Sequence, residues 1–198
     1  MADADTDRTK ALLREQASAR RAALGEDFRQ EASRRAAAHF AKDVTLEPGA
    51  IVAAYWPMRD EMDCRPLLLW LAERGQPICL PAVVTREKPL AMRLWVHDAP
   101  LYPNGFGTLA PADDAALVEP DVVLLPLLAF DRTGTRLGYG AGYYDRTMAA
   151  LSKPVRRIGY AFAAQEMPVL PRELHDVPLQ AVVTEEGIRH FMDNGEAA

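Results

Sequence analysis

Hydrophobic positions recur along the chain at two spacings, and the change from one to the other marks the predicted elements. Over residues 7–24 the spacing is helical; Asp7 can cap this helix and Gly25 ends it. A second helix is predicted from about Asp27 to Ala41. The chain therefore begins with two helices before any strand.

Short apolar runs bounded by proline, glycine or polar residues follow, and such runs are typical of strands. The clearest is Val122 to Leu125, which is apolar throughout and lies between Asp121 and Pro126, as expected of a strand covered on both faces. We predict that it is the central strand of a sheet. The other predicted strands are residues 51–55, 77–83, 90–96, 156–162 and 181–184.

Two further helices lie between these strands. One begins near Pro66 and ends at Gly75, and the other runs from about Tyr143 to Leu151. Residues 99–120 are expected to be mostly irregular. Strands that alternate with helices predict an α/β fold with a sheet of parallel character.

Length and composition narrow the possible classes of protein. The 198 residues fit one domain, and 49% hydrophobic content is ordinary for a globular protein. The longest apolar run, Val122 to Phe130, is far shorter than the roughly 20 residues that span a bilayer. A net charge of −5 argues against a general nucleic-acid binder. We expect a cytoplasmic protein with Cys64 and Cys79 as reduced thiols.

The stretch from Ala129 to Arg146, AFDRTGTRLGYGAGYYDR, passes from a strand end through alternate glycines into a helix start. The first N–H groups of a helix lack intrahelical partners, and the helix dipole favours negative charge there, so such a junction suits phosphate. We expect Gly138, Gly140 and Gly142 to adopt positive φ and to let the backbone approach an anion closely.

Three arginines of this stretch are suited to phosphate oxygens: Arg132, Arg136 and Arg146. Two common phosphate loops do not match, because Tyr143 replaces the third glycine of GxGxxG and GxxxxGK[ST] is absent. The glycines alone would equally fit a tight connection in which they serve only geometry. Together with the arginines, the tyrosines and Asp145, they favour a ligand site.

This constellation, RLGYGAGYYD preceded by AFDRTG, resembles the signature of the 5-formyltetrahydrofolate cyclo-ligase family. Three more segments are similar to family segments in the family's order: KALLR, which contains Lys10 and Arg14, YWPMRDEMDCRPLL from Tyr55, and HDVPLQAVVTE from His175. Ala141 departs from the pattern, because glycine is common there. Since positive φ would strain an alanine, we expect an ordinary negative φ at Ala141.

The resemblance implies a fold and a reaction. The fold is a single-domain α/β sandwich over residues 1–198, with a mixed, largely parallel central sheet flanked by helices. The reaction uses ATP and Mg²⁺ to close 5-formyltetrahydrofolate, with or without a polyglutamate tail, into 5,10-methenyltetrahydrofolate, ADP and phosphate. A formamide oxygen is a poor leaving group, and ATP can convert it into phosphate. The expected partner is this small molecule, with no nucleic acid or membrane, and the expected state is a monomer.

The resemblance also implies roles for individual residues. Arg136 is the expected catalytic residue, because it lies two residues before the first of the glycines. The expected ATP-binding residues are Lys10, Arg14, Arg136, Leu137, Gly138, Tyr139, Gly140, Ala141, Gly142, Tyr143 and Tyr144. Lys10 and Arg14 lie four positions apart and so on one helix face. Without the resemblance, a solvated face would be the simpler interpretation.

Metal and folate binding involve further residues. The resemblance implies Asp145 and Asp176 as Mg²⁺ ligands, in keeping with the preference of Mg²⁺ for carboxylate oxygens; alone, Asp145 would fit a dipole-favouring role. His175 is interpreted as structural or at the surface. The expected substrate-binding residues are Trp56, Glu61, Tyr139, Gly140, Ala141, Gly142 and Tyr143, with Glu61 accepting ring N–H groups. Trp95 and Phe106 fit either the lining of the folate pocket or, as the simpler interpretation for each, packing in the core.

Two other functions remain open. One is a different ATP-dependent enzyme on the same scaffold, which would differ in the substrate segment Tyr55 to Glu61. The other is a non-catalytic folate- or nucleotide-binding protein. The joint presence of basic and acidic residues suited to a metal-phosphate group argues against it, because folate binding alone needs none of them.

Overall fold

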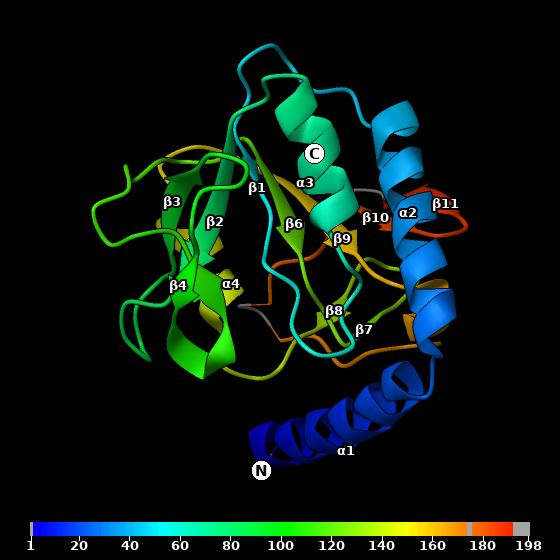
Figure 1. Ribbon diagram of the computed structural model, residues 1–198. Coiled ribbons are helices and arrows are strands. Elements are labelled where there is room, and N and C mark those ends of the chain that lie inside the picture. The colour runs from blue at the N-terminus through cyan, green and yellow to red at the C-terminus, as the bar shows by residue number, and fades with distance from the viewer. Residues whose placement is uncertain (1, 174–175, 192–198) are drawn as a thin grey trace, which may run out of the picture.

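A sheet of seven strands forms the centre of the described chain, residues 2–173 and 176–191 of the computed structural model (Figure 1). In spatial order the strands are β11 (Gly187–His190), β10 (Ala181–Thr184), β9 (Arg156–Tyr160), β6 (Val122–Leu125), β1 (Val52–Ala53), β2 (Ile78–Ala82) and β3 (Ala91–Trp95). The outermost pairs, β10–β11 and β2–β3, are antiparallel, and the pairs between them are parallel. The predicted mixed, largely parallel sheet is confirmed, with β6 in the middle.

Helices cover both faces of the sheet because the side chains of its strands alternate between them. Val122 and Leu124 pack in a core with α2 (Glu26–Asp43) and α3 (Arg65–Glu73). Val123 and Leu125 face the other way, toward α4 (Tyr143–Ala150). Every residue of β6 is buried, which confirms the prediction of a strand covered on both faces.

Helix α1 (Ala2–Ala22) crosses the end of the sheet at which the parallel strands finish (Figure 1). Its residues Leu13 and Ala17 pack against Leu128, which follows β6, and against Leu137. Leu137 belongs to a two-stranded hairpin made of β7 (Ala129–Phe130) and β8 (Arg136–Leu137). The amino-terminal helix is therefore brought to the segment that precedes the glycines.

Several local predictions were wrong. Asp7 lies inside α1 and does not cap it, because the helix begins at Ala2. Gly25 is the N-cap of α2, and α1 has already ended at Ala22. The polar strand β11 was missed because GIRH carries no apolar run and depends on pairing with β10.

Residues 99–120, expected to be mostly irregular, contain only short elements: β4 (Tyr102–Pro103), η1 (Gly105–Gly107) and β5 (Leu109–Ala110). A further 3₁₀ turn, η2 (Ala163–Gln165), follows β9. Cys64 and Cys79 are buried and free of disulfides. No helix in the described part of the chain is long and apolar enough to cross a membrane.

Replacing Gly134 by alanine should destabilise the protein more than the same change at Gly49. Both glycines have φ of +79°, so both variants carry a strain of about 1–2 kcal/mol. A Cβ at Gly134 would also lie 2.7 Å from the Leu179 carbonyl oxygen, whereas nothing lies within 4 Å of one at Gly49. Overpacking of this kind adds about 1–3 kcal/mol. Urea unfolding of both variants measures the difference, and equal midpoints would contradict the prediction.

Candidate active site

The loop between β8 and α4 has the conformation that its glycines permit. Gly140 and Gly142 have φ of +94° and +65°, and Gly142 is the left-handed N-cap of α4. Gly138 does not have positive φ, so that expectation was wrong. Ala141 is not among the described non-glycine residues that have positive φ. This confirms the expectation of an ordinary negative φ at Ala141.

Two arginines lie directly against this loop. Arg14 of α1 donates from Nε to the carbonyl oxygen of Gly138 over 3.0 Å. Its guanidinium would lie 3.1 Å from a Cβ at Gly140, and Arg146 Nη1 would lie 2.8 Å from one at Gly142. The missing Cβ atoms therefore leave room for cations as well as for turns in the backbone.

Arg132 does not take part in this arrangement, although it was expected to be a phosphate-binding cation. Its side chain is 84% exposed and its ion-pair partner in the described chain is Glu166, at 3.5 Å. Arg132 lies in the turn of the β7–β8 hairpin, whereas Arg136 lies on β8. The hairpin separates the two arginines, and the sequence alone did not show that β8 exists.

Arg136 and Asp145 form an ion pair beside the loop. Arg136 Nη2 lies 2.6 Å from Asp145 Oδ1, and Nη1 donates to the carbonyl oxygen of Val177. The N–H of Val177 donates to the same Asp145 Oδ1 over 3.2 Å. Val177 directly follows Asp176, so this bond brings the backbone beside Asp176 to Asp145.

Lys10 reaches the same segment from α1. Its Nζ lies 2.6 Å from Asp176 Oδ2 and 2.5 Å from Glu173 Oε2, and the lysine side chain is buried. Burial acts to lower the pKa of Lys10, but the bonds to Asp176 and Glu173 outweigh it and raise the pKa. Sequence reasoning missed Glu173, although an acid three residues before a predicted metal ligand was a usable signal. His175 lies outside the described residues.

These groups fit a nucleotide with a magnesium ion. Lys10, Arg14 and Arg136 supply cations around the amino-terminal end of α4, where phosphate oxygens are favoured. Mg²⁺ prefers carboxylates and keeps several waters, so Asp145 and Asp176 are sufficient as protein ligands. The hydrogen bonds from Arg136 and from Val177 N–H both use Oδ1 of Asp145.

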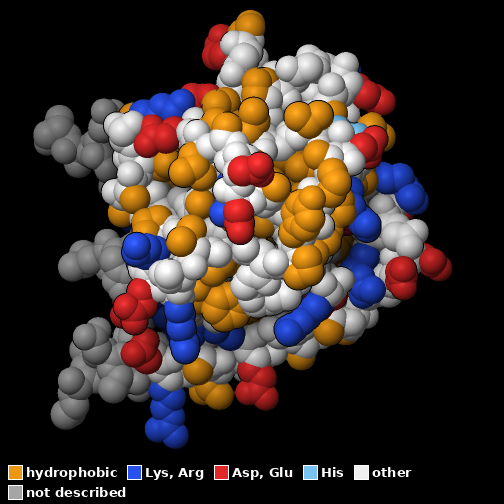
Figure 2. Space-filling view, turned by 60° about the vertical axis from the view of Figure 1, so that its left-hand side comes forward, with side chains coloured by type: hydrophobic (Ala, Val, Ile, Leu, Met, Phe, Trp, Pro, Cys, Tyr) orange, Lys and Arg blue, Asp and Glu red, His pale blue; other side chains and the backbone are white. Residues whose placement is uncertain are grey.

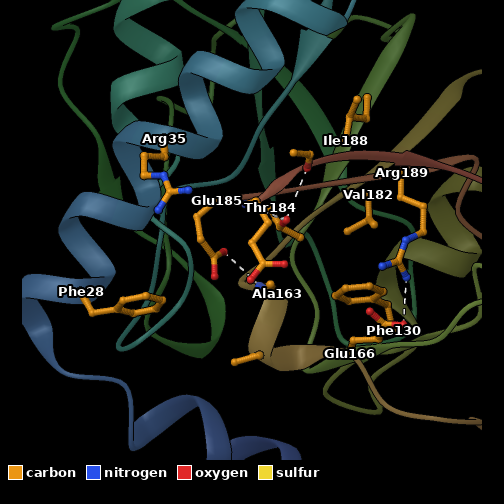
Figure 3. A pocket seen from close by; sticks show the side chains of 13 residues that line it. Phe28, Arg35, Phe130, Ala163, Glu166, Val182, Thr184, Glu185, Ile188 and Arg189 are labelled. Carbon is orange, nitrogen blue, oxygen red and sulfur yellow. Dashed lines mark hydrogen bonds and ion pairs between the residues drawn. The ribbon is translucent and has the colours of Figure 1, made fainter.

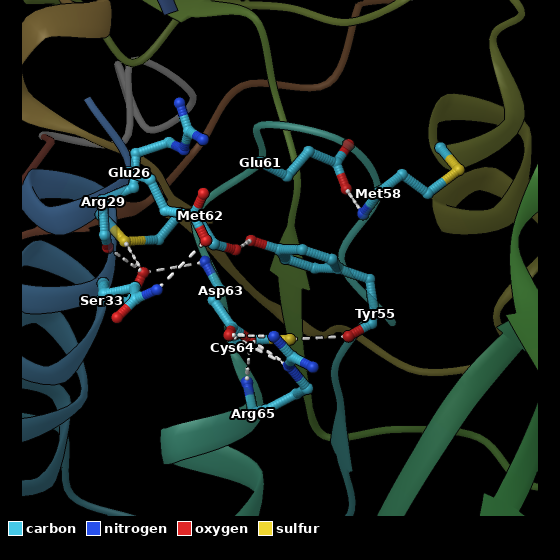
Figure 4. A network of polar contacts seen from close by, with 11 residues as sticks. Glu26, Arg29, Ser33, Tyr55, Met58, Glu61, Met62, Asp63, Cys64 and Arg65 are labelled. Atoms are coloured by element: carbon cyan, nitrogen blue, oxygen red, sulfur yellow. Dashed lines mark hydrogen bonds and ion pairs between the residues drawn. The ribbon is translucent and has the colours of Figure 1, made fainter. Parts of the chain in front are cut away.

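Glu61, the predicted folate carboxylate, is buried at the end of the loop that follows β1 (Figure 4). Its Oε2 accepts the N–H of Met58 over 2.9 Å, and its Oε1 accepts the hydroxyl of Tyr139 over 2.8 Å. Burial raises the pKa of Glu61, while the bonds from Met58 and Tyr139 act to lower it. Tyr139 belongs to the glycine loop, so the two predicted halves of the site meet at this bond.

The loop that carries Glu61 is fixed by its own polar contacts (Figure 4). The hydroxyl of Tyr55 donates to the Met62 carbonyl oxygen and the Cys64 thiol donates to the Tyr55 carbonyl oxygen, each over 2.6 Å. The backbone N–H of Asp63 donates to Ser33 on α2 over 3.0 Å. These bonds hold the position of Glu61 without using its carboxylate.

The predicted aromatic residues occupy two places. Trp56 packs edge-on against the buried Trp95 at 6.0 Å, and burial of Trp95 is confirmed. Phe106 was expected in the core but is 63% exposed and packs on Tyr143 at 5.6 Å. Figure 2 shows the molecule with the left-hand side of Figure 1 turned forward, and hydrophobic side chains gather on this face among charged ones. Phe106 was misassigned because a lone aromatic does not reveal which side of a turn it occupies.

The remaining predicted loop residues pack beside the site. Leu137 is buried against α1, and Tyr144, which belongs to α4, packs against the hydrophobic core on that face of the sheet. Burial, the largest contribution, raises the pKa of the Tyr144 phenol. The hydroxyl of Tyr143 is buried and has no partner among the described residues, whereas its ring lies 5.0 Å from the Arg146 guanidinium. Tyr143 is thus positioned at the loop rather than in the core.

A cavity of about 640 Å³ lies elsewhere, between α2, η2 and the turn from β10 to β11 (Figure 3). None of the predicted site residues is among the described residues that line it. Two pairs of its lining residues interact: Arg189 lies 2.9 Å from Glu166, and Glu185 accepts the N–H of Ala163. The cavity and the candidate site are therefore different places.

Comparison with known proteins identifies the relationship. The model of the 5-formyltetrahydrofolate cyclo-ligase family matches residues 6–185. The chain belongs to this family. The 5-formyltetrahydrofolate cyclo-ligase of Escherichia coli K12 is 33% identical over 171 residues, which cover 83% of this chain and 94% of the relative. That of Mycolicibacterium smegmatis is 34% identical over 69% of this chain and 74% of the relative.

The cyclo-ligase fold is confirmed by solved structures. The 5,10-methenyltetrahydrofolate synthetase of Aquifex aeolicus superposes with a TM-score of 0.81 and 28% identity over 96% of each chain. The synthetase of Mycoplasma pneumoniae, at 22% identity, shares the fold with a TM-score of 0.73 over 89% of this chain and 99% of that one. The protein is therefore an enzyme of the cyclo-ligase family, and its single-domain α/β architecture was correctly predicted.

Proposed function

We propose that this cyclo-ligase uses ATP and Mg²⁺ to convert 5-formyltetrahydrofolate into 5,10-methenyltetrahydrofolate, ADP and phosphate. One observation carries the proposal. The glycine loop lies against Arg14 on one side and contributes Tyr139 to Glu61 on the other, so cations suited to phosphate adjoin a carboxylate suited to a ring edge. A site for phosphate alone would not need Glu61 at this position.

The proposed reaction has two steps. The formyl oxygen attacks the γ-phosphorus of ATP, the bond to the β-phosphate oxygen breaks, and ADP leaves. N10 then attacks the formyl carbon and loses its proton, while the carbon–oxygen bond breaks and phosphate leaves with the former formyl oxygen. Phosphoryl transfer mainly requires positioning and neutralisation of charge, so no protein nucleophile is needed.

The residues of the site divide this work. Lys10, Arg14 and Arg136 bind phosphate oxygens, and Arg136 is the residue whose planar fork is held beside the loop by Asp145. Asp145 and Asp176 would hold Mg²⁺, which supplies additional neutralisation of the phosphate charge when bound. Lys10 and Asp176, which pair with each other here, would separate, Lys10 to phosphate and Asp176 to the metal, whereas Asp145 can keep Arg136 on Oδ1 and offer Oδ2 to the metal.

Glu61 and the glycine loop bind the folate. Glu61 uses one lone pair on each oxygen for Met58 and Tyr139, and a carboxylate has about four such sites. It can therefore accept two further N–H groups from an aminopyrimidinone ring. Trp56, on the same loop as Glu61, and Tyr143, at the end of the glycine loop, offer apolar surfaces for the folate.

The activity is tested by mixing purified protein with 5-formyltetrahydrofolate, ATP and Mg²⁺ and following the near-ultraviolet absorbance of the methenyl product. Product should form only when all three are present. ATP hydrolysis with no folate product would instead support a related ATP-dependent enzyme with a different substrate. Folate binding without ATP use would support a binding protein. We also propose that the protein is a cytoplasmic monomer. Light scattering tests the monomer, and cell fractionation tests the location.

Oxygen from the formyl group should appear in the released phosphate. With ¹⁸O in the formyl group, each turnover should transfer the label to phosphate, because the formyl oxygen leaves on phosphorus in the proposed second step. Mass spectrometry of the phosphate measures the transfer, and ATP labelled in the γ-phosphate serves as the control. Label that stays in the folate or enters water would rule out phosphorylation of the formyl oxygen.

A further inference from the structure

Arg21, in the last turn of α1, joins three segments that are far apart in the sequence. Its Nη2 donates to Asp60 Oδ1 over 2.9 Å and to the hydroxyl oxygen of Tyr139 over 2.8 Å. Its Nη1 lies 3.4 Å from the carbonyl oxygen of Leu127, and the residue is only 2% exposed. Neither the sequence motifs nor the proposed reaction gives this arginine a role.

The contact with Tyr139 determines the direction of the next hydrogen bond. A guanidinium can only donate, whereas a phenol can accept and has a single proton to donate. With Arg21 donating to the phenol oxygen, the proton of Tyr139 is directed to Glu61 Oε1, 2.8 Å away. The carboxylate of Glu61 is thereby oriented by a chain of donors that begins on α1.

We propose that Arg21 is a positioning residue for folate recognition: through the hydroxyl of Tyr139 it holds Glu61 as an oriented, ionised carboxylate. The inference rests on the proposed function, because it takes the folate ring as the ligand of Glu61. It adds a residue of α1 to the folate half of the site, whereas Lys10 and Arg14 of the same helix face the phosphate half.

The hydrogen bonding of Arg21 is not the arrangement that best stabilises a fold. Its Nε is buried and has no partner among the described residues, and such an unmade hydrogen bond is unfavourable. A buried ion pair can often be replaced by apolar residues without loss of stability. Apolar packing would also fill this position, but it would not direct the proton of Tyr139.

The charges around Glu61 show why this direction matters. The groups that face it are Met58 N–H, Tyr139, Arg21 and Asp60, with Tyr55, Tyr144 and Cys64 also close enough to interact. Burial raises the pKa of Glu61 and Asp60 adds to this, whereas Met58, Tyr139 and Arg21 lower it. Loss of Arg21 removes one of these lowering contributions and frees the phenol proton to turn away. The carboxylate would then be protonated at higher pH.

The test compares Arg21→Met with the wild-type full-length chain. The dissociation constant of 5-formyltetrahydrofolate should rise about tenfold near neutral pH. The acid limb of its pH dependence should move to higher pH, and KM for Mg-ATP should change by less than about twofold. Arg21→Lys should recover part of the affinity, because it keeps the charge but not the planar fork. Unchanged folate affinity and pH profile in a folded Arg21→Met variant would overturn the inference.

Two matched variants separate positioning from general effects. Arg20→Met removes a charge from the same helical turn, where Arg20 contacts only the Glu166 carbonyl oxygen in the described structure, and should leave folate affinity unchanged. Asp60→Asn weakens the ion pair of Arg21 but keeps the bond from Arg21 to Tyr139. It should therefore lower the thermal stability and change folate affinity little. A loss of folate affinity in either variant equal to that of Arg21→Met would assign the effect to charge or folding instead.

A double-mutant cycle with Tyr139→Phe gives the final criterion. If Arg21 acts mainly through the phenol, Arg21→Met should have a much smaller effect on folate affinity in the Tyr139→Phe background than in the wild type, because only its direct charge effect on Glu61 remains. Additive losses would overturn the inference. If Arg21→Met does not fold, the same cycle with Arg21→Lys decides the question. A wild-type protein that does not bind 5-formyltetrahydrofolate would overturn the proposed function, a result distinct from wild-type binding that is insensitive to Arg21.

Discussion

Replacement of Arg136 by alanine should lower kcat/KM for Mg-ATP by about 10²–10³-fold, the effect of removing one preorganised electrostatic donor. Its side chain is 7% exposed, and its guanidinium is fixed by Asp145 and by the Val177 carbonyl oxygen. A cation held in this way does not need to reorganise when charge moves to the transferred phosphoryl group. The variant should keep its affinity for folate, because the bonds of Arg136 in the described structure go to Asp145 and Val177 and not to the Glu61 loop.

Arg132→Ala is the matched control for this prediction. Arg132 lies in the same hairpin, but it is exposed and pairs with Glu166, so its loss should change kcat/KM by less than about twofold. Arg136→Lys should recover only part of the activity, since lysine cannot reproduce the planar fork. Steady-state kinetics of the three variants, with circular dichroism to confirm folding, measures the comparison. A fully active Arg136→Ala variant would place Arg136 outside the reaction.

Asp145→Asn and Glu61→Gln should impair different halves of the reaction. An asparagine oxygen can still accept from Arg136 and from Val177 N–H, so Asp145→Asn keeps the local bonds and removes the charge. The apparent Mg²⁺ requirement should rise by at least about tenfold, equivalent to about 1.4 kcal/mol. Affinity for 5-formyltetrahydrofolate without nucleotide should stay at the wild-type value.

Glu61→Gln should have the opposite effect. Both oxygens of Glu61 accept bonds from protein donors, so a glutamine must direct its NH₂ group at Met58 N–H or at Tyr139, whose oxygen already accepts from Arg21. A misplaced buried polar group costs about 1–3 kcal/mol, or about 5–150-fold in folate affinity. Titration of folate and of Mg-ATP against both variants checks the division. A Glu61→Gln variant that loses Mg-ATP and keeps folate would contradict it.

Much of this protein follows from local patterns in its sequence. The four apolar residues Val122 to Leu125 can satisfy both faces of a sheet only in its interior, and they form the middle strand. Glycines before Tyr143 predict a turn into a helix, and Gly142 caps α4 in the left-handed conformation. Such features depend on backbone sterics and side-chain burial over a few residues, which a single sequence displays directly.

Local patterns were less informative where pairing or packing between distant segments decides the outcome. The strand β11 has polar residues and exists because β10 offers it an edge. Arg132 and Arg136 look alike in the sequence, but the β7–β8 hairpin directs one to Glu166 and the other to Asp145. The exposed position of Phe106 depends on a turn whose direction a lone aromatic does not reveal.

By itself, the sequence determined the α/β class, the central strand and the glycine turn, and it predicted a phosphate site and a folate site. These depend on composition, periodicity and short motifs, and on a resemblance spread over most of the chain. Only the tertiary structure decided which charges pair, because ion pairs such as Lys10 with Glu173 and Asp176 join residues more than 160 positions apart. It also decided that hydrogen bonds run from Arg21 through Tyr139 to Glu61: a hydrogen bond requires atoms within about 3 Å, and only the folded chain sets that distance.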